Sequence, residues 1–139
     1  MNKFLIDTHV LLWLLFSPEK LHRNFLERLA DRKNNISVSS ISFWEISLKF
    51  RLGKLGLKGV LPNELPGLVT QMGIHIADIT ADEFSRFHEL PLTKEHKDPF
   101  DRMIIWQCIS QKLVLVSHDS KLEEYTRLGL QLLKTETVE

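Results

Sequence analysis

Short apolar runs that suit buried strands alternate along the whole chain with longer runs that have helical spacing. We expect strands over residues 3–6, 36–40, 74–79, 113–116 and 130–133. We expect helices over residues 8–16, 21–32, 42–52, 68–72, 99–111 and 120–128, and a further one that begins after Thr80. Helices between successive strands make those strands parallel and cover the sheet on both faces. The alternation therefore predicts a three-layer α/β fold, in which helices flank a central parallel sheet of four to five strands.

Residue type also marks helix starts and one long loop. The stretches from Ser42 to Glu45 and from Thr80 to Glu83 have the S/T-x-x-E form of a capping box, in which the two side chains bond each other's backbone. Residues 53–66 are rich in glycine and contain two prolines, so we expect an irregular loop or a mobile flap there.

Composition narrows the class of protein. A length of 139 residues is most economically one domain, 1–139. The net charge of zero gives no global attraction for nucleic acid, so such binding would need a local patch. The lone Cys108 excludes an internal disulfide and a multi-cysteine zinc site, and it fits a reducing cytoplasm. Residues 10–16 are too few to span a bilayer, which takes roughly 20, so we expect a cytoplasmic protein without a membrane segment.

Acidic residues lie at or soon after the carboxyl ends of the expected strands, or at the start of the helix that leads to the next strand. They are Asp7, Glu45, Asp98, Asp101 and Asp119. Because ligands of open α/β sheets bind beyond the carboxyl ends of the strands, the topology can bring these acids to one edge. Two like charges at ~4 Å repel by about 4 kcal/mol at an effective dielectric of 20, so such a cluster would protonate or bind a cation. Carboxylate oxygens favour a hard divalent ion such as Mg²⁺ or Mn²⁺.

A purely structural interpretation exists for each of these acids. All of them lie near helix N-termini, where a carboxylate caps free N–H groups and suits the helix dipole. Glu45 fits the third position of a capping box, and Asp98 precedes Pro99 as a cap precedes a first-turn proline. A single acid is therefore weak evidence for a site, and the argument depends on whether several of them meet.

Four stretches together resemble the PIN-domain family, and within it the VapC-like toxins of bacterial toxin–antitoxin pairs. They are "LIDTHVLLW", "SSISFWEISLK", "KDPFDRMIIWQ" and "LVLVSHDSKLEEY", in this order from end to end. The resemblance implies a metal-dependent endoribonuclease with Mg²⁺ or Mn²⁺, an RNA substrate and a cognate antitoxin protein as partner. Its catalytic acids fall on Asp7, Glu45, Asp101 and Asp119.

The resemblance also implies a role for each acid. Asp7 and Asp101 would be the principal metal ligands, and Glu45 would be a ligand or would position the attacking water. Asp119 would support the metal directly or through water. Asp98 lies three residues before Asp101 on the same helical face, and would be a further ligand or a supporting group.

Several neighbouring polar residues are candidates for substrate binding. Thr8 and Ser117 flank the acids and would hydrogen-bond a ligand or a carboxylate, or else cap helices. A basic group follows Glu45 and would guide a phosphate backbone or form ordinary solvated surface: Lys49, Arg51, Lys54 and Lys58. Arg102, beside Asp101, would pair with an acid or contact phosphate.

Ring-bearing residues support several interpretations. The histidines near the acids, which could shuttle protons, are His9, His96 and His118. The tryptophans lie on apolar helices, where burial is expected and RNA stacking or a dimer interface is the alternative: Trp13, Trp44 and Trp106. The apolar surplus of helices such as residues 10–16 favours a homodimer or an antitoxin groove.

Other functions remain open at this point. A PIN-like domain that binds a partner and cleaves nothing would show the same motifs. Phosphoryl-transfer enzymes of the haloacid-dehalogenase type have a D-x-D motif directly after their first strand. The corresponding residues here, Asp7-Thr8-His9, lack the second aspartate. Receiver domains would need paired acids at that position and a late lysine, and neither is clear here.

Overall fold

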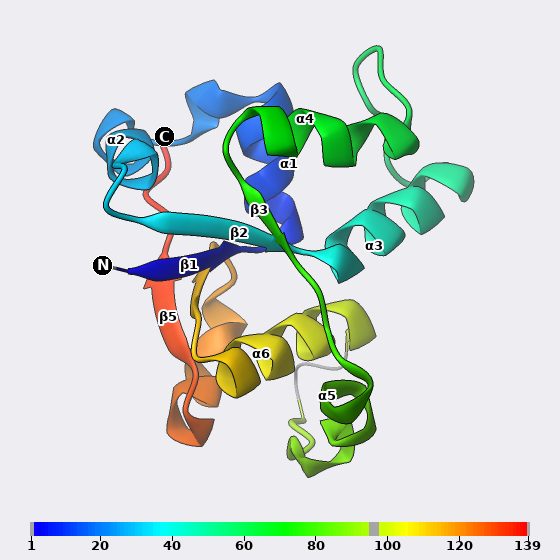
Figure 1. Cartoon of the computed structure of the whole chain (residues 1–139), viewed down its shortest axis with the longest axis vertical. Coiled ribbons are helices and arrows are strands. Elements are labelled where there is room, and N and C mark those ends of the chain that lie inside the picture. The colour runs from blue at the N-terminus through cyan, green and yellow to red at the C-terminus, as the bar shows by residue number, and fades with distance from the viewer. Residues whose placement is uncertain (1, 95–97, 139) are drawn as a thin grey trace.

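A five-stranded parallel sheet forms the centre of the protein, seen in a computed structural model that describes residues 2–94 and 98–138 (Figure 1). Its strands are β1 (Lys3–Ile6), β2 (Asn35–Ser39), β3 (His75–Ala77), β4 (Val114–Ser117) and β5 (Gln131–Lys134). Their spatial order is β3-β2-β1-β4-β5, and every neighbouring pair is parallel. The predicted α/β fold with four to five parallel strands is therefore confirmed.

Helices cover both faces of this sheet. They are α1 (Thr8–Phe16), α2 (Arg23–Ala30), α3 (Ser40–Arg51), α4 (Leu65–Gln71), α5 (Ala81–Ser85) and α6 (Pro99–Gln111), with short 3₁₀ helices η1 (Pro18–Lys20), η2 (Pro62–Glu64), η3 (Phe87–Glu89) and the longer η4 (Ser120–Leu128). In Figure 1, α1, α2 and α4 lie on one side of the sheet, and α5 and α6 lie on the other. None of the described helices is long and apolar enough to cross a bilayer.

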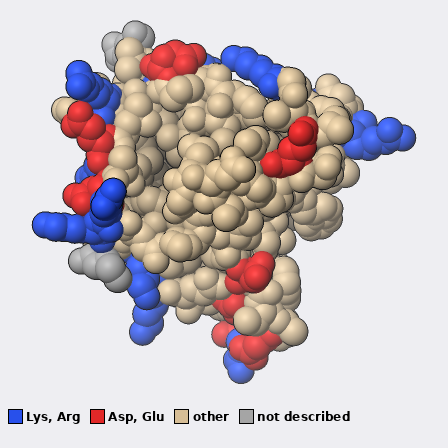
Figure 2. All heavy atoms as spheres, turned by 45° about the horizontal axis from the view of Figure 1, so that its top comes forward, with Lys and Arg blue, Asp and Glu red and all other residues tan. Residues whose placement is uncertain are grey.

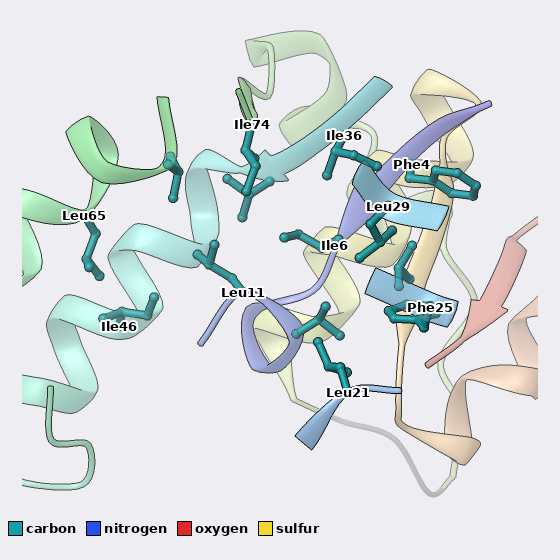
Figure 3. Close-up of a cluster of buried hydrophobic side chains, with 14 residues drawn as sticks. Phe4, Ile6, Leu11, Leu21, Phe25, Leu29, Ile36, Ile46, Leu65 and Ile74 are labelled. Carbon is teal, nitrogen blue, oxygen red and sulfur yellow. The ribbon is translucent and has the colours of Figure 1, made fainter. Parts of the chain in front are cut away.

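The alternation of side chains along the strands produces two cores. Phe4 and Ile6 of β1 belong to one cluster with residues of α1, α2 and α4, which Figure 3 shows in close-up. Leu5 points to the other face and packs in a second cluster, with Met103 and Tyr125 among its members. Because β1 is buried on both faces, its register with β2 and β4 is strongly specified, and the residue after it has a defined position.

Most boundaries lie within a few residues of the expected ones, and α4, β3 and η4 show the clearest differences. α4 begins at Leu65 and includes Pro66 in its first turn, where proline is tolerated because its missing N–H has no helical partner there. The expected strand over residues 74–79 is shorter, at His75–Ala77. Residues 120–128 form a 3₁₀ helix. The capping box from Thr80 to Glu83 is present as predicted.

Candidate metal centre

Asp7 lies at the carboxyl end of β1, where it begins α1. Its Oδ1 accepts a hydrogen bond from the N–H of Val10 at 2.9 Å, and its own N–H donates to the carbonyl of Val116 at 3.0 Å. The carboxylate is thus a helix cap held between the two central strands. Burial raises the pKa of Asp7, and hydrogen bonds from Ser117 and Val10 oppose this rise without cancelling it. The nearby charge of Glu45 contributes to the rise in the pKa of Asp7.

Glu45 is buried at the middle of α3, and the predicted capping box from Ser42 is wrong. α3 begins two residues earlier than expected, at Ser40, with Ser39 as its cap. Glu45 is 3% exposed, and its Oε1 lies 2.7 Å from the hydroxyl of Thr8. A carboxylate this deep needs partners, and the structure supplies them from α1 and from the next turn of α3.

The ammonium of Lys49 is the charged partner of this glutamate. Its Nζ lies 2.5 Å from Oε2 of Glu45, one turn away on α3. Partial burial acts to lower the pKa of Lys49, but the hydrogen bond to Glu45 raises it overall. The charges of Asp98 and Asp101 act in the same direction. The positive charge of Lys49 is therefore attracted by Glu45, Asp98 and Asp101, and it partly offsets their negative charge.

Asp98 and Asp101 place two more carboxylates at the start of α6. Oδ1 of Asp98 accepts from the N–H groups of Phe100 and Asp101 at 2.9 and 3.1 Å, so its predicted role as a cap before Pro99 is confirmed. Glu45, Asp98 and Asp101 each offer an oxygen within 4.8 Å of the others. Opposite ligands of one Mg²⁺ lie about 4 Å apart, so this all-oxygen set has the donor chemistry and the approximate spacing for a hard divalent ion.

A cleft of about 210 Å³ connects this cluster to the central strands. Three of the predicted acids line it together, namely Asp7, Asp101 and Asp119. Asp119 caps η4 by accepting from the N–H of Lys121 at 2.9 Å, and its own N–H donates to the hydroxyl of Ser117 at 3.2 Å. Because Asp101 belongs to both the cluster and the cleft, the structure brings acids from four separate parts of the chain to one edge of the sheet.

The other predicted residues lie at different depths. Thr8 is buried against Glu45 and Ser42, and Ser117 is buried beside Asp119. Lys49 and Lys54 line a neighbouring cleft with Glu45 and Thr8. Arg51 is exposed at the end of α3, and the exposed Lys58 donates to the carbonyl of Phe16 at 3.1 Å.

Arg102 has a structural role, so the prediction that it pairs with an acid or contacts phosphate is wrong. It is 4% exposed, and its guanidinium donates to the carbonyls of Leu90 and Pro91. It also donates to the hydroxyl of Tyr125 at 3.0 Å. These bonds hold the segment before α6 against the second core.

The rings differ in exposure. His9 lines both clefts and His118 lines the larger one, while His96 lies outside the described residues. Trp13 and Trp106 are half-buried, but Trp44 is 60% exposed, so its predicted burial is wrong. Its ring packs edge-on against Phe100, at 5.1 Å between centroids. Sequence reasoning missed Ser42 as a buried neighbour of Thr8, because it assigned this serine to the helix cap.

Charged side chains do not form one broad basic surface on the face drawn in Figure 2. Lys and Arg lie toward the rim of this face, with Asp and Glu between them, and the centre carries few charges. This distribution agrees with the net charge of zero. On this face, attraction for a polyanion would have to come from a few local cations.

Comparisons with known proteins agree with this architecture. The sequence model of the PIN domain matches residues 4–128. The chain is similar in fold to VapBC2 from Rickettsia felis bound to a DNA fragment from its promoter, with a TM-score of 0.68 and 20% identity over 96% of this chain and 99% of that one. It is similar to DNA-bound VapBC from Salmonella typhimurium, with a TM-score of 0.65 and 20% identity over 96% and 98% of the two chains. The PIN domain endonuclease Utp24 aligns with a TM-score of 0.53 and 14% identity over 97% and 90%. No curated protein matches the sequence.

Proposed function

Because the chain belongs to the PIN-domain family, we propose that it is a metal-dependent endoribonuclease, the toxin of a toxin–antitoxin pair. The observation that carries this proposal is the meeting of acids from distant parts of the chain. Oxygens of Glu45, Asp98 and Asp101 lie within 4.8 Å of one another, and Asp101 shares a cleft with Asp7 and Asp119. Helix capping explains Asp7, Asp98 and Asp119, but it explains neither the burial of Glu45 nor the convergence of these acids.

The chain's own residues would divide the work of hydrolysing an RNA phosphodiester. A bound Mg²⁺ or Mn²⁺ would supply charge neutralisation at the phosphate and a more acidic water. Asp7 and Asp101 would hold that ion, with Asp98 and Asp119 as supporting acids. Glu45, fixed by Thr8, would be a ligand or would orient the attacking water.

Basic residues of α3 would guide the substrate, and one hydroxyl would position the acids. Lys49 and Arg51 lie in the last turn of α3, after Glu45 in the chain, and they would guide the phosphate backbone toward the acids. The buried hydroxyl of Ser117 lies between Asp7 and Asp119 and would keep these carboxylates in place.

Cleavage of a mixed RNA pool tests this function. We expect the wild-type chain to cut RNA with Mn²⁺ and to lose this activity in EDTA. Asp7→Asn should reduce cleavage by at least 100-fold, because it removes a ligand charge but keeps the helix cap. Asp31→Asn is the matched control. Asp31 is exposed, and like Asp7 it accepts a hydrogen bond from a backbone N–H, here that of Lys33.

The proposal includes two protein partners, a cognate antitoxin and a second copy of this chain. The structures from Rickettsia felis and Salmonella typhimurium are VapBC complexes, and this likeness in fold supports a cognate antitoxin for this chain. The exposed rings of Trp44 and Phe84 support a homodimer, because large apolar side chains gathered on a surface favour burial against another protein. A chain that bound such partners but cut no RNA under any divalent metal would be a binding module instead.

A further inference from the structure

The cleft that holds Asp7, Asp101 and Asp119 has an aromatic wall as well as carboxylates. Trp13 of α1 and His118, which follows β4, both line it. Their ring centroids lie 5.4 Å apart with the planes at 65°, so the two rings form a corner. Nδ1 of His118 lies 3.0 Å from the hydroxyl of Thr135, and this hydrogen bond orients the imidazole.

Metal and phosphate binding leave this wall unexplained. Both need oxygen donors or positive charge, whereas the wall continues with the apolar side chains of Ile104, Leu115 and Leu122. Aromatic rings favour offset-stacked and edge-to-face contacts, so a flat ring laid on one member of the corner presents its edge to the other. The corner therefore suits a planar ligand with a hydrophobic face.

The size of the cleft and a nearby cation narrow the choice of ligand. A volume of about 210 Å³ is smaller than the roughly 300–1,000 Å³ of pockets that enclose drug-sized ligands, so it suits one planar ring system. Nζ of Lys20 lies 6.0 Å from the centroid of the Trp13 ring. A cation beside the aromatic wall fits a ligand that joins a flat ring to a phosphate.

We propose that Trp13 and His118 stack one nucleobase of a single-stranded RNA next to the phosphate that the acids act on. The inference rests on the proposed function for the identity of the polymer. Single-stranded RNA is commonly recognised through unstacked bases that lie on aromatic or histidine rings. The consequence is that the site prefers an accessible base at this position over the same backbone within a duplex.

Binding measurements in a variant that does not cleave test this stacking directly. The Asp7→Asn chain would be titrated with a labelled single-stranded RNA octamer and with an octamer of the same backbone that lacks bases. Because both probes carry the same phosphates, the ratio of their dissociation constants reports the bases alone. Stacking of one base should make the base-bearing probe bind about 5- to 150-fold more tightly.

Substitutions in the corner should abolish the preference for the base-bearing probe, which this ratio measures. We expect it to fall toward one in Trp13→Leu and in His118→Ala, and to stay largely intact in Trp13→Phe and His118→Phe. His118 is exposed, so its variants avoid the risk to folding that the half-buried Trp13 carries. His88→Ala is the matched control for His118→Ala, because His88 is an exposed histidine in η3 that does not line the cleft, and its ratio should not change.

Three results would overturn the proposal. One is a ratio near one for the parent Asp7→Asn chain, and another is an equal loss of the ratio in His88→Ala. The third is an unchanged ratio in Trp13→Leu and His118→Ala, which would show that the corner does not stack a base. Failure of the proposed nuclease activity is a separate result, since it would appear as absence of metal-dependent cleavage by the wild-type chain.

Discussion

Burial of the Asp7 carboxylate lowers the stability of the metal-free protein when this carboxylate is ionised. Its pKa is raised by burial, so between the ordinary and the raised value the folded state binds more protons than the unfolded state. Stability must therefore fall as pH rises through that window, and above it the ionised Asp7 destabilises the fold. In EDTA at pH 7.5 we expect Asp7→Asn to melt about 3–5 °C above wild type, since asparagine keeps the cap on Val10 and removes the charge.

The same variant supplies its own controls. The difference in melting temperature should shrink as pH falls through the raised pKa of Asp7 toward the ordinary pKa of an aspartate, and Mn²⁺ should stabilise wild type more than Asp7→Asn. Asp31→Asn, at an exposed turn, should show neither effect. A metal-free Asp7→Asn chain that melts below wild type at pH 7.5 would show that Asp7 is mainly a stabilising cap.

At the scale of elements, helix caps and candidate ligands are the same residues. Asp98 begins α6 by accepting from two backbone N–H groups, and it also contributes an oxygen to the acidic cluster. Comparing Asp98→Asn with Asp98→Ala separates these roles. The alanine variant should be less stable than the asparagine variant by about 1 kcal/mol in urea unfolding, while both lose the same charge. Equal stabilities would contradict the capping role of Asp98.

The limits of sequence-based prediction lie at the same scale. Asp98 and Thr80 were predicted as caps because a cap and its N–H groups lie within one helical turn. The start of α3 was misplaced because Ser39, Ser40 and Ser42 offer competing caps, and burial of Glu45 depends on Thr8, 37 residues away. The α/β alternation predicted the sheet, but the contacts of Arg102 and the exposure of Trp44 depend on how helices pack, which no local pattern encodes.

At the scale of the whole molecule, a groove of about 280 Å³ lies between α3, α5 and the start of α6. Exposed rings line it, Trp44 at 60% and Phe84 at 48%, together with Phe100 and Met103. We expect two copies to bury this surface, so light scattering should give twice the chain mass of 16.2 kDa. Trp44→Glu should shift the mass to that of one chain, because the buried charge would lack a partner. Lys112→Glu, at the exposed end of α6, should leave the mass of the dimer unchanged. A wild-type chain that stays at 16.2 kDa would contradict the homodimer.

The position of a bound divalent ion tests the gathering of acids most directly. A crystal structure of the protein with Mn²⁺ should show anomalous density within about 2.0–2.6 Å of carboxylate oxygens from at least two of Asp7, Glu45 and Asp101. The ion should be absent from crystals of Asp101→Asn, whose acid belongs to both the cluster and the cleft. Mn²⁺ that bound only elsewhere on the surface, with these carboxylates unchanged around Lys49, would contradict the metal centre.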